Sequence, residues 1–132
     1  MNLENILITG SSGLVGAPLV TKLLNKSNLI VGVDPVINSE CNENYKHISI
    51  PFNSVEDVTN LLEKYDITKI IHTGGISGPM LANENPNIII ENNIFFTMYL
   101  IEAARIFKKI NRFIFCSSIS AYGELVESDT TE

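Results

Sequence analysis

The sequence predicts an α/β domain in which helices cover both faces of a doubly wound, Rossmann-type parallel sheet of about five strands. Two observations indicate this fold. Short apolar runs alternate with segments of helical periodicity along the whole chain. The runs are continuously apolar, as in strands buried on both faces, instead of alternating between apolar and polar residues. Right-handed crossovers join such strands in parallel sheets.

The first half of the chain contains two strands with a helix between them. Residues 5–9 form a short run rich in β-branched side chains that ends at Gly10. Residues 14–24 place leucines and valines at helical spacing. Residues 29–33 form a second apolar run, which Asp34 closes. The polar residues that follow predict a loop.

The middle of the chain repeats this order. Residues 47–50 predict a weaker third strand, and residues 54–65 predict a helix with one apolar face. Residues 67–72 predict a fourth strand. It ends at Thr73, where small residues begin.

A long helix and a fifth strand complete the predicted domain. Asn85 followed by Pro86 is a helix start signal, and we expect this helix to extend over residues 86–109. It has more apolar positions than one sheet contact needs, so we expect a second buried face. Residues 112–116 predict the fifth strand.

The composition limits the class of protein. The chain has 132 residues, 45% of them apolar, which is enough for a folded core. It carries 9 Lys and Arg against 15 Asp and Glu, a net charge of −6, which disfavours a nucleic-acid partner. No apolar stretch approaches the roughly 20 residues of a membrane span, and no secretory leader is evident. We therefore expect no membrane partner and a cytoplasmic location.

The two cysteines, Cys41 and Cys116, are far apart in the sequence. We expect one loop thiol, at Cys41, and one small buried residue, at Cys116, in preference to a disulfide.

The most specific local signal is the run Gly10-Ser11-Ser12-Gly13-Leu14-Val15-Gly16 between the first strand and the first helix. The first glycine allows a tight turn, the second lets the backbone approach a pyrophosphate, and the third lets the helix pack closely on the strand. Free N–H groups at the helix start favour anions. The alternative is an ordinary glycine-rich turn. The residues of this loop expected to contact a bound cofactor are Gly10, Ser12, Gly13, Leu14, Val15 and Gly16.

Asp34 supports a dinucleotide site. It ends the second predicted strand, about 20 residues after the glycine loop, which is the separation expected for a ribose-binding carboxylate. A carboxylate there accepts hydrogen bonds from the ribose hydroxyls and repels a 2′-phosphate. The cofactor prediction is therefore NAD in preference to NADP. The alternative is a turn residue before Pro35.

Small residues follow the fourth predicted strand. Thr73, Gly74 and Gly75 lie at the sheet edge where ligands bind in such folds, and they allow a dinucleotide to approach the backbone. The alternative is a flexible loop. We expect His72 to pack at the strand end, not to act as a base.

With these motifs in order, the chain resembles the N-terminal part of the extended short-chain dehydrogenase/reductase family, the NAD-dependent epimerases and dehydratases of nucleotide sugars. The resemblance spans essentially the whole chain. It rests on the segments ILITGSSGLVGAPLV, VGVD, DITKIIHTGGISGP and NNIFFTMYLIEAARIFKKINRFIFCSSISAYG. In that family the GxxGxxG spacing is the normal form of the cofactor loop.

The resemblance implies roles for single residues. It places the pyrophosphate on the three loop glycines, the adenosine ribose on Asp34, and the cofactor against the segment 73–75. Asn93 matches an asparagine that supports the active site, and Ser118 matches a catalytic Ser or Thr that hydrogen-bonds the sugar oxygen being oxidised. Three further residues are expected beside the cofactor, namely Phe52, Cys116 and Ser117.

The sequence also departs from the family pattern. Phe52-Asn53 stands where an acidic residue usually contacts adenine, and Phe96 replaces a small residue. The catalytic Tyr-x-x-x-Lys is matched only by Tyr65 and Lys69, which we interpret as a coincidental surface pair. The true motif and the substrate domain are expected beyond Glu132, so the chain alone is expected to be inactive.

Together these features predict the NAD-binding portion of an epimerase or dehydratase that acts on a nucleotide sugar by transient hydride transfer. One alternative is a dinucleotide-binding or sensor module without catalysis, and another is a remnant without function. The resemblance further implies a homodimer through the helix at residues 86–109. The sequence does not identify the sugar or the particular reaction.

Overall fold

The chain folds around one five-stranded parallel sheet. A computed structural model describes residues 4–37, 42–49, 52–76 and 85–123, and the structural statements below concern these residues. The strand order is β3-β2-β1-β4-β5, and every neighbouring pair is parallel. The strands are β1 (Asn5–Thr9), β2 (Leu29–Val33), β3 (Tyr45–Ile48), β4 (Lys69–His72) and β5 (Arg112–Phe115).

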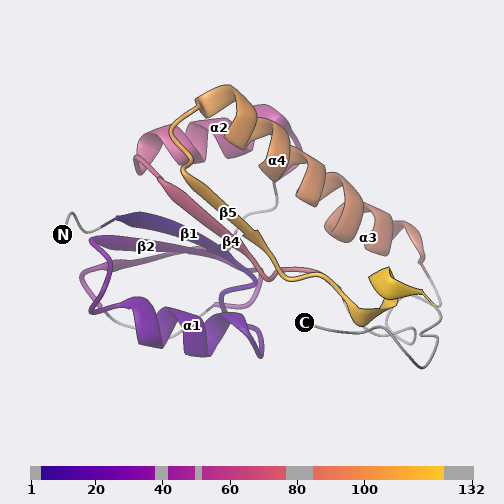
Figure 1. The fold of residues 1–132 in the computed structure, drawn as a ribbon, viewed down its shortest axis with the longest axis horizontal. Helices are drawn as coiled ribbons and strands as arrows, with labels where there is room; N and C mark the ends of the chain where they lie inside the picture. The colour runs from indigo at the N-terminus through magenta and orange to yellow at the C-terminus, as the bar shows by residue number, and fades with distance from the viewer. Residues whose placement is uncertain (1–3, 38–41, 50–51, 77–84, 124–132) are drawn as a thin grey trace.

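Helices lie on both faces of the sheet (Figure 1). Helix α1 (Gly16–Leu23) covers one face, and α2 (Val55–Lys64) packs beside α4 (Phe96–Phe107) on the other. The predicted doubly wound α/β fold is therefore confirmed. Helix α4 continues a helical run that begins with α3 (Asn87–Ile89) and passes through η2 (Ile90–Phe95), a π-helical segment.

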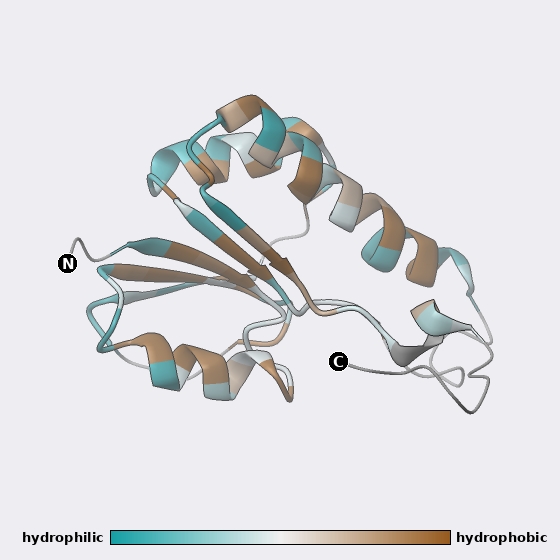
Figure 2. Cartoon of the chain, viewed as in Figure 1, coloured by the Kyte–Doolittle hydropathy of each residue, from teal (hydrophilic) through white to brown (hydrophobic). Residues whose placement is uncertain are grey.

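Two apolar clusters fill the space between the sheet and the helices, and the strands between them are strongly hydrophobic (Figure 2). Ile6, Ile8 and Ile30 face α1 and bury Val20 and Leu24 of its segment. Alternate strand residues point to the other side, as expected for β-structure. There the core cluster comprises Leu7, Val31, Val33, Val58, Leu61, Leu62, Ile67, Ile70, Leu100 and Ala103.

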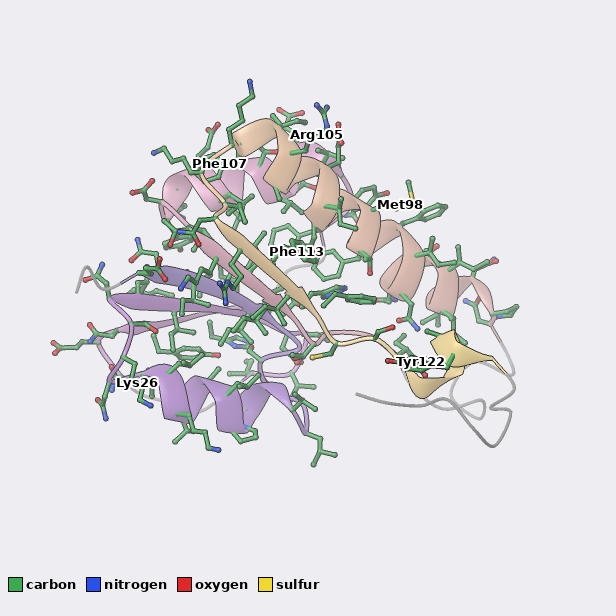
Figure 3. All side chains as sticks on the ribbon, viewed as in Figure 1. Lys26, Met98, Arg105, Phe107, Phe113 and Tyr122 are labelled. Atoms are coloured by element: carbon green, nitrogen blue, oxygen red, sulfur yellow. The ribbon has the colours of Figure 1, made fainter. Side chains whose placement is uncertain are left out.

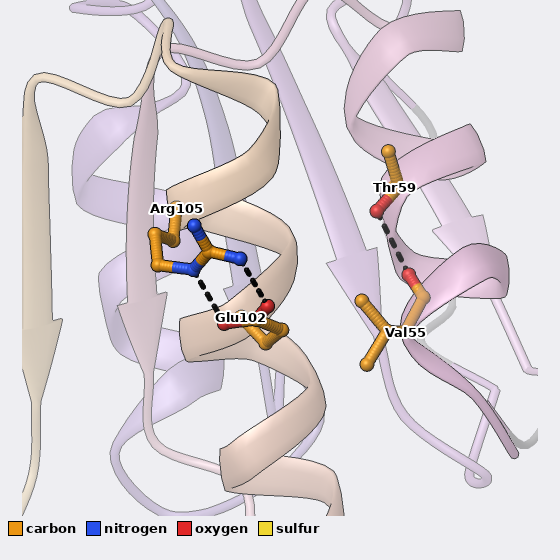
Figure 4. A network of polar contacts seen from close by, with 4 residues as sticks. All are labelled: Val55, Thr59, Glu102 and Arg105. Atoms are coloured by element: carbon orange, nitrogen blue, oxygen red, sulfur yellow. Dashed lines mark hydrogen bonds and ion pairs between the residues drawn. The ribbon is translucent and has the colours of Figure 1, made fainter.

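Local hydrogen bonds explain where α2 begins and how it continues. The hydroxyl of Ser54 accepts a hydrogen bond from the amide of Asp57 at 3.1 Å, a standard N-cap. Inside the helix the hydroxyl of Thr59 donates to the carbonyl of Val55, and Glu102 pairs with Arg105 on the neighbouring α4 (Figure 4). Each of these contacts links residues three or four positions apart, as helical geometry requires.

Several predicted boundaries needed correction. The third strand begins at Tyr45, two residues before the predicted position. Strand β4 begins at Lys69, two residues after the predicted position, because residues 65 and 66 form the turn from α2 and residues 67 and 68 lead from it into the strand. The helix at residues 86–109 is not uniformly α-helical, since η2 interrupts it. A short 3-10 helix, η3 (Ile119–Tyr122), had no sequence signal that we recognised.

In the single chain, the second face of the long helix that was expected to be buried is exposed. The exposed fractions of Ile94, Met98 and Ile101 are 51%, 56% and 54%. Figure 3 shows the Met98 and Arg105 side chains pointing away from the sheet. The sheet and α2 cover one side of this helix, and the described residues provide nothing that covers the other.

The expectation of a buried Cys116 is also wrong. Cys116 follows the edge strand β5, and its thiol is exposed and free. An edge strand has a neighbour on one side only, which leaves its end less covered. Cys41 lies outside the described residues. In the described part of the chain no helix is long and apolar enough to cross a membrane.

Candidate functional site

The loop after β1 begins with a turn that only glycine makes easily. Gly10 has a φ of +67°, and its amide donates a hydrogen bond to the carbonyl of Val33 at 2.8 Å. A Cβ at this position would lie 2.7 Å from the backbone nitrogen and Cα of Gly74. The predicted tight turn is confirmed. In addition, this glycine lets the ends of β1 and β4 approach each other.

The other two glycines bring α1 close to the end of β1. A Cβ on Gly16 would lie 2.0 Å from the carbonyl oxygen of Gly10, so no side chain fits there. The predicted close packing of helix on strand is confirmed. The amide of Gly13 donates to the same carbonyl at 3.0 Å, which closes the loop over the helix start.

Asp34, directly after β2, is held by backbone N–H groups. Its Oδ2 accepts a hydrogen bond from the amide of Ser12 at 3.1 Å, and its Oδ1 accepts one from the amide of Val36 at 2.9 Å. The Ser12 hydroxyl donates to the carbonyl of Val36 at 2.7 Å. Donors to both oxygens fix the orientation of the carboxylate next to the glycine loop.

The loop after β4 is fastened to the end of β1. Both the amide and the hydroxyl of Thr73 donate to the carbonyl of Thr9, at 3.2 and 2.7 Å. The amide of Gly74 donates to the Thr9 hydroxyl at 3.2 Å. These contacts give the segment a defined path along the sheet edge, in place of the flexible loop that was the alternative.

Asn93 connects the long helix to this segment. Its side-chain amide donates to the carbonyl of Ile76 at 2.8 Å, and its Oδ1 accepts from the Ile76 amide at 2.7 Å. A Cβ on Gly75 would lie 3.2 Å from Oδ1, so the glycine leaves room for this contact. Asn93 therefore supports one wall of the site.

Phe96 fills space between two aromatic neighbours. Its ring stacks on that of Phe52, with centroids 5.9 Å apart and an interplanar angle of 4°. It meets the His72 ring edge to face, with centroids 5.6 Å apart. The bulky residue at this family position thus packs against the residue that stands near the expected adenine contact. Phe96 is the first residue of α4.

These elements enclose a cleft of about 1240 Å³ at the carboxyl edge of the sheet. Strand order reverses between β1 and β4, and ligands bind at such a switch point in open α/β sheets. All predicted site residues except Ser12 and Gly16 line the cleft. They are Gly10, Gly13, Leu14, Val15, Asp34, Phe52, Thr73, Gly74, Gly75, Asn93, Cys116, Ser117 and Ser118. Lining the cleft places these residues together, and their individual roles stay predictions.

The segment after β5 brings the predicted serine to the mouth of the cleft. The amide of Cys116 donates to the carbonyl of His72 at 3.0 Å, which continues the strand pairing for one residue. Ser118 then precedes η3, and its carbonyl accepts from the amide of Ala121 at 3.0 Å. Among the described residues no group of three or more His, Cys, Asp or Glu could hold a metal ion.

Sequence reasoning missed a polar group beneath Asp34. The Tyr45 hydroxyl lies 3.3 Å from the Ser11 hydroxyl and 3.2 Å from Nδ1 of His47, and Nε2 of His47 donates to the Asp34 carbonyl at 3.1 Å. A Cβ on Gly32 would lie 2.2 Å from the Tyr45 hydroxyl. A glycine inside a strand whose other residues are large and aliphatic was the available signal, because it marks close approach of another group.

His72 and the pair Tyr65 and Lys69, which were not expected to act in catalysis, lie away from the lining of the cleft. His72 is buried at the strand end, where burial lowers its pKa to about 4, and it packs between Phe96 and Phe115. Lys69 begins β4 at the opposite edge of the sheet, paired with Glu4. Neither Tyr65 nor Lys69 lines the cleft.

Sheet order, glycine loop and strand-end carboxylate place the domain in the Rossmann class. The chain belongs to the NAD-dependent epimerase/dehydratase family, whose pattern matches residues 6–132. It is 33% identical over 138 residues to an uncharacterized protein of Methanocaldococcus jannaschii, covering 93% of this chain and 42% of that one. It is 29% identical to the dTDP-glucose 4,6-dehydratase of Salmonella typhimurium, covering 96% of this chain and 40% of the relative.

A solved structure gives the same relationship in three dimensions. The UDP-glucuronic acid 4-epimerase of Bacillus cereus, in complex with UDP-glucuronic acid and NAD, has a TM-score of 0.80 and 29% identity. The match covers 96% of this chain and 44% of the epimerase. The chain thus spans about two fifths of the length of these relatives.

Proposed function

We propose that the chain is the NAD-binding portion of an epimerase or dehydratase that acts on a nucleotide sugar. The observation that carries this proposal is the arrangement of Asp34 and the glycine loop. The carboxylate is fixed by the Ser12 amide at 3.1 Å, directly beside the turn at Gly10. One cleft therefore joins an anion-binding helix start to a ribose-binding acceptor.

The residues present fit a dinucleotide. At Gly10 and Gly74 the two loops approach so closely that a Cβ on either residue would lie within 3.0 Å of the other's backbone. The amides of Gly10, Gly13 and Gly74 are bonded within the protein. The absence of side chains at Gly10 and Gly74 therefore serves to let a pyrophosphate come close to the backbone at the start of α1. In this assignment Gly10, Gly13 and Gly16 form the phosphate loop.

Asp34 is proposed to accept hydrogen bonds from the adenosine ribose and to select NAD over NADP. Its negative charge lies where a 2′-phosphate would come, and like charges at short range repel. No Arg or Lys occurs between residues 34 and 45 to offset that repulsion. Phe52 and Phe96, stacked at the adjacent wall, offer a flat apolar surface for the adenine.

Bound NAD supplies a nicotinamide that can take a hydride from a sugar carbon and return it. Ser118 is proposed to donate a hydrogen bond to the sugar oxygen, stabilising it as charge develops there. Asn93, through its two bonds to Ile76, is proposed to hold the wall of the cleft. The cleft contains no Tyr-x-x-x-Lys pair among its lining residues, so we propose that these 132 residues bind the cofactor but do not complete the reaction.

The exposed face of the long helix is proposed to form a homodimer contact. Ile90, Ile94, Met98 and Ile101 are all large, apolar and exposed, and they recur at spacings of three and four residues. A stripe of this kind on a folded protein marks an interaction surface.

Nuclear magnetic resonance titration with NAD tests the proposed site. We expect the largest amide shifts at Gly10, Gly13, Asp34 and Gly74, and small shifts on the outer side of α1. Saturable shifts confined to other parts of the molecule, or none with NAD in excess, would contradict the assignment.

A further inference from the structure

His72 lies behind the wall of the cleft without lining it. Its side chain is 1% exposed, at the end of β4. Both ring nitrogens nevertheless have hydrogen-bonding neighbours, Thr9 on β1 and Thr97 on α4. Thr97 does line the cleft, so the histidine touches the site through another residue.

The hydrogen bonds of the Thr97 hydroxyl determine whether Nε2 of His72 carries a proton. The Thr97 hydroxyl lies 2.7 Å from the carbonyl oxygen of Asn93, and a carbonyl can only accept a hydrogen bond. The single hydroxyl proton is therefore used. Nε2 of His72, 2.8 Å from the same hydroxyl, must then donate to it.

The protonation of Nε2 in turn determines the state of Nδ1. A neutral imidazole with its proton on Nε2 has a bare Nδ1, which accepts. The Thr9 hydroxyl, 2.5 Å from Nδ1, donates to it. The Thr9 oxygen in turn accepts the amide of Gly74 at 3.2 Å. Each hydroxyl then both donates and accepts, and no proton is used twice.

The result is a chain of hydrogen bonds with one direction. It begins at the Gly74 amide and passes through Thr9, His72 and Thr97 to the Asn93 carbonyl. The side chain of the same Asn93 hydrogen-bonds the backbone amide and the carbonyl of Ile76. Three strand and helix ends, from β1, β4 and α4, meet at the histidine.

We propose that His72 is a positioning residue whose neutral ring, with its proton on Nε2, holds Asn93 and the segment 73–76 in place as the wall of the nucleotide cleft. The functional part of this inference rests on the proposed NAD site. The groups described around the ring are Thr9 from β1, Phe115 from β5, and Phe96 and Thr97 from α4. None of these neighbours is charged.

Substitutions at Thr97 separate hydrogen bonding from packing. Thr97→Val keeps the shape of the side chain but removes the acceptor for Nε2 and the donor to Asn93. Thr97→Ser restores the hydroxyl. We expect Thr97→Val to speed amide hydrogen exchange at Ile76 and Gly74 by about tenfold, the scale expected for one lost buried hydrogen bond. Thr97→Ser should recover most of that protection. His72→Phe, which keeps an aromatic ring, should resemble Thr97→Val.

Nitrogen-15 spectra of the imidazoles test the tautomer directly. The chain has 2 histidines, so His47→Gln assigns both sets of ring signals. We expect His72 to show a protonated Nε2 and a bare Nδ1 at neutral pH. A proton on Nδ1 would overturn the proposal. So would Ile76 exchange in Thr97→Val equal to that of the unaltered chain.

Affinity measurements separate this inference from the proposed function. If NAD binds, His72→Phe should weaken it by about tenfold although His72 lies outside the cleft lining. Unchanged affinity in a folded His72→Phe would overturn the positioning role. If NAD fails to bind the unaltered chain, the proposed function fails, while the tautomer and the Ile76 exchange still decide whether His72 holds the wall.

Discussion

The backbone amide of Ser12 donates a hydrogen bond to Oδ2 of Asp34 at 3.1 Å. This contact joins the loop after β1 to the end of β2, two segments that are distant in the sequence. It orients the carboxylate before any ligand arrives, and such preorganisation lowers the cost of binding.

Gly10→Ala should destabilise the chain by about 3 kcal/mol, because a Cβ there meets a left-handed backbone and also overlaps Gly74. Gly123→Ala is a matched control. Its φ of +72° is similar, but no atom lies within 4 Å of the added Cβ. It should cost only about 1 kcal/mol. Chemical denaturation measures both. Equal losses would show that the close approach of the two loops contributes nothing.

His72 should make stability depend on pH. Burial lowers its folded pKa from 6.5 to about 4, so between these values the unfolded chain binds more protons than the folded chain. Stability from this group is fully present above about pH 6.5 and falls as the pH drops toward 4, by on the order of 3 kcal/mol in total.

The control for this pH dependence is His72→Gln, which does not titrate. Unfolding free energies of both chains over that pH range give a difference that isolates the histidine from the carboxylates. Parallel curves for the two chains would contradict a buried neutral ring.

The exposed face of the long helix should mediate self-association. Met98→Glu with Ile101→Glu places two charges among large apolar side chains, where burial of an unpaired charge is costly. We expect sedimentation velocity to show a dimer for the unaltered chain and a monomer for this double variant. Thr21→Glu, on the exposed side of α1, is the control and should leave the dimer intact. A monomer at every concentration of the unaltered chain would refute the proposed contact.

Local sequence signals predicted the fold well. Residues 5–9 and 29–33 match β1 and β2, because a continuous apolar run between turn residues leaves little choice of structure. The glycine loop was also predictable, since its three glycines have separate steric reasons. The third strand was placed too late because Tyr45, a buried residue, follows polar residues that predicted a loop.

Other features depend on contacts across the sheet. Three sets of hydrogen bonds join residues far apart in sequence. They link Ser12 to Asp34, Asn93 to Ile76, and His72 to Thr9 and Thr97. No local pattern encodes the distances involved. The burial of Cys116 was predicted wrongly for a related reason, because an apolar strand at the edge of a sheet has the same sequence pattern as one at its centre.

Calorimetric titration with NAD and NADP measures whether the cleft binds NAD through Asp34. We expect NAD to bind about tenfold more tightly than NADP. Asp34→Ala should weaken NAD binding by about tenfold and reduce the difference in affinity between NAD and NADP. Ser118→Ala, at a cleft residue to which no ribose contact is assigned, is the comparison and should keep the preference for NAD over NADP. Tighter binding of NADP, or an Asp34→Ala variant with unchanged affinity for both nucleotides, would show that Asp34 does not bind the ribose of NAD.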